Sequence, residues 1–140
     1  QTNYSSPVQV GNLNYWLSIS GSIGGYHSLA IQSPGTLWAW GLNSYGQLGT
    51  SNQTNYSSPV QVGALNYWTS VVAGYNSTLA IQSPGTLWAW GVNLSGELGL
   101  GNTVSYSSPI QVGSLTSWKQ VASGHRHTHM IQAPDYWYNQ

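Results

Sequence analysis

Charged side chains are nearly absent from this sequence. Two basic and two acidic residues make up 3% of its 140 residues, where about 25% is usual. Without a basic patch, the chain lacks the electrostatic footprint that binds nucleic acid or an anionic membrane surface, so we expect neither partner. A net charge near zero promotes association. The composition therefore favours a self-assembling or adhesive protein over a freely soluble cytosolic one.

Cysteine and long apolar runs are also missing. Without cysteine, neither a disulfide nor a thiolate metal site can brace the fold. No apolar stretch approaches the roughly 18 residues of a membrane span, so we expect no membrane insertion. Eight Trp and ten Tyr make aromatic packing the main source of stability. Because the chain begins at Gln1 rather than at Met, we expect a processed protein or a piece of a longer one.

One structural unit recurs along the chain. The segment 31–41 returns without a change at 81–91, a spacing of 50 residues, and the segment that begins at Tyr4 returns at Tyr56 and Tyr106. A period of this length is typical of solenoids, propellers and arrays, in which each unit buries its apolar face against its neighbours. We divide the chain into a first repeat with a leading outer strand, a second repeat and a partial third repeat, at residues 1–55, 56–105 and 106–140.

Each repeat contains four short runs of residues that favour β-structure. In the second repeat they are residues 60–62, 69–73, 78–82 and 86–90. Ser83-Pro84-Gly85 between the last two runs predicts a tight hairpin turn. Four strands repeated at this spacing are typical of a β-propeller blade. We therefore predict an all-β propeller array of about twelve strands, enough for about three blades of a larger ring or of a head-to-tail assembly. Three blades are fewer than the roughly four to eight that close a propeller.

Tryptophan recurs at fixed positions of the repeat. In Leu87-Trp88-Ala89-Trp90, alternation sends both indoles to one face of a strand and the leucine and alanine to the other. Both faces are apolar, as expected when a blade lies between two others. We predict that tryptophan wedges between blades, with a structural core that includes Trp16, Trp38, Trp40, Trp68, Trp88, Trp90 and Trp118.

Several of these motifs resemble a known family. The run from Gly85 to Gly99, with Leu79-Ala80-Ile81 before it and Ser108-Pro109 after it, is similar to the regulator of chromosome condensation repeat. The resemblance implies a β-propeller. Members of the family include a eukaryotic nucleotide-exchange factor on chromatin, secreted β-lactamase inhibitors, and many microbial and viral surface proteins, so the fold leaves the function open. We expect a microbial or viral extracellular type.

Three histidines form the one concentrated group of titratable side chains. On an extended strand His125, His127 and His129 would share a face, and three imidazoles can bind Zn²⁺. The repeat, however, aligns His127 with His27, which the resemblance makes a structural residue, and His129 with the core position of Leu29. We therefore favour a structural role and expect no metal and no cofactor.

The acidic residues indicate no catalytic centre. Glu97 and Asp135 are the two acids, and they occupy unrelated repeat positions, so neither a carboxylate pair nor a serine triad can form. We expect a non-enzymatic structural and interaction module that lies outside the cell, on a cell surface or on a virion surface. The alternative is a secreted protein-binding propeller that resembles the β-lactamase inhibitors. Exchange-factor activity is disfavoured, because the charged residues expected for nuclear and chromatin contacts are missing.

Two surfaces are candidates for contact with a partner, either another protein or a glycan. The rim residues that we expect to take part are Tyr26, Tyr45, Tyr75, Asn76, His125 and Arg126. The second surface is an assembly edge formed by Val8, Gln9 and Val10 in a predicted outer strand. An unpaired strand seeks a partner. We expect this edge to complete the blade at residues 119–138 of another copy, head to tail, in a ring or filament, or to pair with further repeats of a longer chain.

Overall fold

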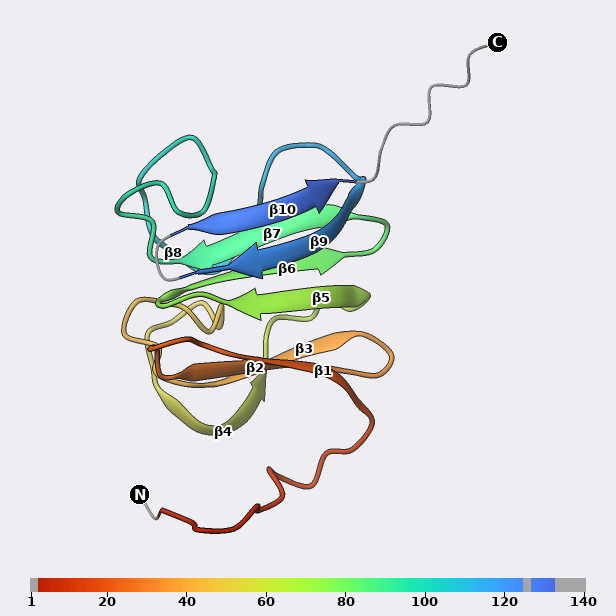
Figure 1. Cartoon of the computed structure of the whole chain (residues 1–140), viewed down its shortest axis with the longest axis vertical. Coiled ribbons are helices and arrows are strands. Elements are labelled where there is room, and N and C mark those ends of the chain that lie inside the picture. The colour runs from red at the N-terminus through yellow and green to blue at the C-terminus, as the bar shows by residue number, and fades with distance from the viewer. Residues whose placement is uncertain (1–2, 125–126, 133–140) are drawn as a thin grey trace.

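The protein folds into three antiparallel sheets stacked along one axis (Figure 1). The computed structural model describes residues 3–124 and 127–132, and these contain ten strands and no helix. Blade 1 has the strand order β1-β2-β3-β4, blade 2 the order β5-β6-β7-β8, and blade 3 pairs β10 with β9. Their bounds are β1 (Trp16–Gly21), β2 (His27–Gln32), β3 (Thr36–Gly41), β4 (Tyr56–Gln61), β5 (Trp68–Ala73), β6 (Ser77–Gln82), β7 (Thr86–Gly91), β8 (Tyr106–Gln111), β9 (Trp118–Ser123) and β10 (Thr128–Gln132).

The Ser-Pro-Gly segments form the hairpin turns that the sequence predicts. In blade 1, β2 pairs with β3 from Gln32 opposite Thr36 onward. Gly35 closes the turn by donating its N–H to the Gln32 carbonyl at 2.8 Å, with a φ of 138°. A Cβ at Gly35 would lie 2.8 Å from the Tyr67 nitrogen, so the turn needs glycine because the start of the next blade passes so close.

Each blade has two different apolar faces. The leucine face of blade 1 consists of Leu29, Ile31, Leu37 and Ala39, and its tryptophan face consists of Trp16, Ile19, Trp38 and Trp40. We use the same two names for the equivalent faces of the other blades. The leucine face of blade 1 packs against the tryptophan face of blade 2 in the first core, which also contains Trp68, Val71, Ala80 and Trp90.

The second interface repeats this arrangement. The leucine face of blade 2, with Leu79, Ile81 and Leu87, packs against Val121 and Trp118 of blade 3. Strand contacts follow the same direction, because β5 lies against β2 and β1, and β9 lies against β6 and β5. Blade stacking is therefore directional: each leucine face covers the tryptophan face of the next blade.

The N-terminal segment corrects one prediction. Residues 3–15 contain no strand, although we predicted an outer strand over Pro7 to Val10. The equivalent strand β4 closes blade 1 because Val60 pairs with Ala39 of β3. No described strand of this chain pairs with the N-terminal segment. With residues from 133 onward outside the described part, ten strands are seen where about twelve were predicted.

Within the described ranges, the structure has no helix that is long and apolar enough to cross a membrane.

Candidate functional site

The tryptophan face of blade 2 is enclosed. Trp68 lies between Trp88 and Trp90, with ring centroids 6.1 and 6.2 Å apart. Trp68 and Trp90 are buried, and the Trp90 Nε1 donates to the Gln47 carbonyl of the preceding blade at 3.0 Å. A buried indole N–H needs such a partner. These contacts are those of a tryptophan face that a neighbouring blade covers, and they are the reference for the face of blade 1.

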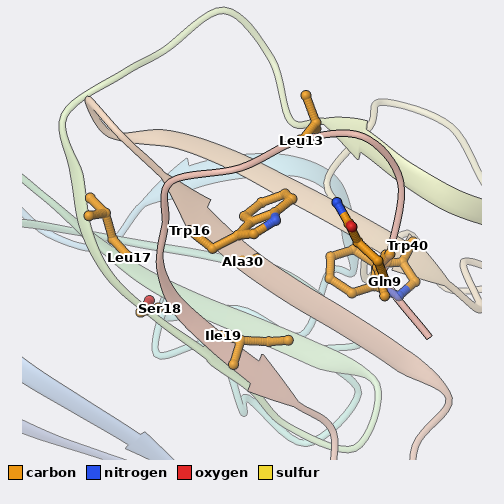
Figure 2. Close-up of a pocket in the computed structure, with 9 residues that line it drawn as sticks. Gln9, Leu13, Trp16, Leu17, Ser18, Ile19, Ala30 and Trp40 are labelled. Atoms are coloured by element: carbon orange, nitrogen blue, oxygen red, sulfur yellow. The ribbon is translucent and has the colours of Figure 1, made fainter. Parts of the chain in front are cut away.

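The tryptophan face of blade 1 has the same ring arrangement, but no blade of the described residues lies on it. Trp16 lies 6.3 Å from Trp38 and 6.5 Å from Trp40, and all three rings are half-buried. Ile19 is 73% exposed, whereas Val71 at the equivalent position of blade 2 is 9% exposed. The face borders a depression of about 490 Å³, shown in Figure 2, which is lined by Gln9, Val10, Leu13, Trp16, Leu17, Ser18, Ile19, Ala30 and Trp40.

The depression corresponds to the first interior core without its leucine face. Its members Val10, Trp16, Ile19 and Trp40 occupy the repeat positions of Val62, Trp68, Val71 and Trp90, respectively. All four of these equivalents belong to the core between blades 1 and 2. The depression therefore has the residues of one side of such a core and lacks the leucine face that forms the other side.

The predicted assembly edge lies beside this open face. Val8, Gln9 and Val10 are exposed, and Gln9 and Val10 line the depression together with Leu13. Figure 2 shows the chain that bears Gln9 and Leu13 passing over Trp16 and Trp40. The segment thus borders the open face with side chains and does not present a strand edge.

The predicted tryptophan core is fully enclosed at two positions. Trp68 and Trp90 are buried, whereas Trp16, Trp38, Trp40, Trp88 and Trp118 are half-buried. Three of the half-buried rings belong to the open face of blade 1, where no leucine face excludes solvent. The neighbouring blade changes burial at two repeat positions, where Trp16 and Trp40 are half-buried but Trp68 and Trp90 are buried, whereas Trp38 and Trp88 are half-buried on both faces.

A loop of blade 1 is fixed onto blade 2 through Gln47. The Gln47 carbonyl accepts hydrogen bonds from Thr78 Oγ1 at 2.8 Å and from the Trp90 indole, and the side-chain Oε1 accepts the Tyr45 N–H at 3.0 Å. Its Nε2 donates to Asn76 Oδ1 at 3.4 Å. Gln47 is buried, and sequence reasoning did not identify this residue. The one available signal was its place in the glycine-rich crossover between repeats.

The crossover loops are held in shape by buried asparagines. Asn43 donates to the Asn52 carbonyl at 3.0 Å and to Thr50 Oγ1 at 3.1 Å, and its Oδ1 accepts the Leu48 N–H at 2.9 Å. Asn93 makes the equivalent bonds to Asn102 and Leu98 in the next repeat. These asparagines replace the regular backbone ladder in a loop that must run between blades.

Three of the six predicted rim residues meet in one cavity. Tyr45, Tyr75 and Asn76 border a space of about 320 Å³ together with Glu97, whose Oε2 accepts the Ser95 N–H at 2.9 Å. The remaining lining residues are Ser77, Val92, Leu94 and Ser95.

Of the other three rim residues, the structure describes only Tyr26. Tyr26 borders a separate depression of about 550 Å³ with Trp40, Leu42 and Tyr56 among its lining residues. His125 and Arg126 lie outside the described residues.

His27 is buried between blades 1 and 2. Its Nε2 lies 3.4 Å from Thr78 Oγ1, and its Nδ1 has no hydrogen-bond partner among the residues that the structure describes. Burial removes solvent from the imidazolium form and lowers the pKa of His27 to about 4. In blade 3, the rings of His127 and His129 are 5.1 Å apart. The described residues contain no group of three potential ligands that could hold a metal, and the zinc arrangement that we considered depends on His125, which lies outside them.

Comparisons with known structures identify the fold. Human WBSCR16 is similar over 91% of this chain and 33% of its own, with a TM-score of 0.75 and 21% identity. Yeast RCC1 (Prp20) bound to Kap60 is similar over 91% of this chain and 30% of its own, with a TM-score of 0.76 and 20% identity. A second structure of Prp20p from Saccharomyces cerevisiae, described with its binding properties to Gsp1p and histones, has a TM-score of 0.71 at 18% identity.

Two sequence relatives are from Arabidopsis thaliana. The mitochondrial RCC1 domain-containing protein RUG3 is 45% identical over 42 residues, and the ultraviolet-B receptor UVR8 is 47% identical over 45 residues. These matches cover 30% and 31% of this chain, and 9% and 10% of the respective relatives. The similarity therefore covers a small part of either relative.

The family model described as the regulator of chromosome condensation (RCC1) repeat matches residues 34–81 and 84–131, and a second model of the same repeat matches residues 19–47. Together with the four-stranded blades and their directional stacking, these matches show that the chain belongs to the RCC1 repeat family of β-propeller proteins.

Proposed function

We propose that this chain is a non-enzymatic structural and interaction module that acts outside the cell, on a cell surface or on a virion surface, and that self-associates into a ring, fibre or filament. The observation that carries the proposal is the open tryptophan face of blade 1. Trp16 and Trp40 of this face, and Val10 beside it, have buried equivalents in the core between blades 1 and 2. A contiguous exposed apolar patch marks an interaction site in a soluble protein.

The composition favours association between copies of the chain over a monomer in solution. Charged residues make up 3% of the chain and the formal net charge is zero, so copies do not repel one another. Leu17 and Ile19 add exposed apolar side chains to the open face. Burial of apolar surface is favourable by roughly 25 cal/mol per Å². Apolar contact without charge repulsion is therefore the expected driving force.

Protein partners also fit what is known of similar structures. The yeast Prp20 structures are described in a complex with Kap60 and with binding to Gsp1p and histones. By this likeness we propose that the partner of this chain is a protein. The near absence of basic residues argues against nucleic acid as a partner.

Sedimentation velocity of the purified chain over a series of micromolar concentrations tests this proposal. Self-association predicts a weight-average sedimentation coefficient that rises with concentration and falls again on dilution. A sedimentation coefficient that stays at the monomer value over the whole series would overturn self-association.

The rim cavity favours a second candidate function, that of a secreted propeller which binds one protein target tightly, as the β-lactamase inhibitors of the family do. It brings Tyr45 and Tyr75 together beside Asn76. Tyrosine is enriched at the binding hot spots of interfaces. Inhibition of a β-lactamase by the chain, lost in Tyr45→Ala and Tyr75→Ala, would support this alternative. A chain that neither binds nor inhibits such an enzyme would contradict it.

A further inference from the structure

The geometry points to a second copy of this chain as the occupant of the open tryptophan face of blade 1, bound through the leucine face of that copy's blade 3. This inference rests on the proposed self-association and gives it a defined surface, partner and direction. It follows from the two interior interfaces, from the two uncovered faces and from the repeat positions that they share.

Both interior interfaces join unlike faces in one direction. Blade 1 offers Leu29 and Ile31 to blade 2, and blade 2 offers Leu79 and Ile81 to blade 3. On the receiving side, β5 and β9 occupy the same position in their blades. In the described part of the chain, no interface joins two tryptophan faces or two leucine faces. The same rule predicts that β1 receives the leucine face of another blade.

The far end of the molecule exposes such a leucine face. On blade 3, Val121 and Met130 pack against blade 2. The alternate positions Ala122, His129 and Ile131 therefore lie on the opposite face, and all three are exposed. They occupy the repeat positions of Val72, Leu79 and Ile81. In Figure 1, blade 3 and blade 1 lie at opposite ends of the stack.

The two ends are thus complementary, and each copy has one of each. Pairing blade 3 of one copy with blade 1 of the next extends the interior stacking across the junction. Such a head-to-tail interface is heterologous, so it produces a ring if the rotation closes and a filament if it does not. A two-fold dimer through the open face of blade 1 would instead place a tryptophan face on a tryptophan face.

His129 makes the junction weaker than an interior interface. Leu29 and Leu79 fill this position with an aliphatic side chain, whereas His129 brings a polar ring that must be desolvated. A His129→Leu substitution restores the residue of the other two repeats. This change offers a gain-of-association test that a merely disruptive substitution cannot provide.

Three substitutions in the full chain, measured by sedimentation velocity, test the assignment. Ile19→Asp places a charge on the open face, and Leu94→Asp is its matched control, because Ile19 is 73% and Leu94 is 74% exposed. We expect Ile19→Asp to raise the concentration needed for association by tenfold or more, which corresponds to about 1.4 kcal/mol. We expect Leu94→Asp to associate as the unmodified chain does, and His129→Leu to associate at a lower concentration. Circular dichroism verifies that each variant keeps the β-fold.

The outcomes separate this inference from the proposed function. If the unmodified chain stays monomeric, both fail. If it associates but Ile19→Asp behaves like the unmodified chain, the open face of blade 1 is not the junction, and self-association still holds. If Ile19→Asp weakens association while His129→Leu leaves it unchanged, the assignment of blade 3 as the partner face is wrong.

Discussion

At the scale of single residues, the repeats contain their own comparisons. His27 lies in the position that Ser77 occupies in the next repeat, and both side chains are buried. A serine hydroxyl brings no titratable charge into the interior, whereas an imidazole brings a potential one. The first blade junction therefore has a pH dependence that the second repeat avoids.

We predict that the free energy of unfolding falls as the pH drops below about 6.5. Above that pH, His27 is neutral in both the folded and the unfolded state. Below it, the unfolded chain binds a proton that the folded state, with a pKa of about 4, does not bind. The loss grows with acidification to about 3 kcal/mol near pH 4. Urea denaturation at neutral and acidic pH measures it, and His27→Ser should remove most of the pH dependence. An equal loss in the variant would show that His27 is not responsible.

Asn43 should contribute strongly to stability, although it lies in a loop. Replacing it with alanine leaves the Leu48 N–H and the Asn52 carbonyl without their partner in a buried site. We expect Asn43→Ala to lower the free energy of unfolding by roughly 2–4 kcal/mol. The exposed Asn66 provides the control, since Asn66→Ala should change the stability little. Equal unfolding midpoints for the two variants would contradict the role of Asn43.

At the scale of the elements, segments of identical sequence show which structural features the local sequence determines. The octapeptide from Tyr4 to Gly11 recurs at Tyr56 to Gly63, yet only the second copy forms a strand. Likewise, residues 31–41 and 81–91 are identical, yet Trp40 is half-buried and Trp90 is 0% exposed. Strand runs, hairpin turns and face alternation were predictable because they depend on local residues. Strand pairing and burial were not, because they depend on which blade lies alongside.

The candidate site was predictable to a smaller extent. Tyr45, Tyr75 and Asn76 were predicted as rim residues because turns between strands lie at the ends of a blade, and the structure places all three around one cavity, while their contact with a partner stays a prediction. The open tryptophan face was missed, because the sequence shows that both faces of a blade are apolar but not which one is covered. A comparison of Ile19 with Val71 shows the difference only once the blades are placed.

Two threonines at equivalent repeat positions should differ in how much they contribute to stability, because they bind different crossover loops. Thr78 Oγ1 donates to the Gln47 carbonyl at 2.8 Å, whereas Thr128 Oγ1 donates to the Glu97 carbonyl at 3.4 Å. We expect Thr78→Val to lower the free energy of unfolding by about 1–2 kcal/mol, and Thr128→Val by less, because the shorter bond is buried and the longer one is partly solvated. Chemical denaturation of both variants checks this. A larger effect at Thr128 would contradict it.

The same repeat position in a covered and an open face provides a second comparison. Trp68 is enclosed by blade 1, whereas Trp16 lies in the open face. Trp68→Ala should cost roughly 3–5 kcal/mol of stability, as expected for a buried aromatic residue. Trp16→Ala should cost clearly less stability when thermal unfolding is measured at a low protein concentration, at which the copies do not associate. Similar losses at both positions would mean that the face of blade 1 is covered within a single copy.

At the scale of the whole molecule, the three described blades form a stack whose first and last faces differ. The chain corresponds to 30% to 33% of the length of the similar propeller structures. Its sheets follow one another in the same direction from the N-terminal to the C-terminal end (Figure 1). The unlike faces are the surfaces through which we propose that such a stack is extended, while pairing of the Val8 to Val10 segment with another copy stays a prediction.

Cross-linking between copies tests the direction of that extension most directly. The natural chain contains no cysteine, so Ile19→Cys and Ile131→Cys copies each carry a single thiol. We predict that a short bis-maleimide linker joins a mixture of the two copies as mixed dimers through residues 19 and 131, with little product when either copy is treated alone. Dimers that form within one variant alone at the yield of the mixture, or no dimers in the mixture, would contradict head-to-tail stacking.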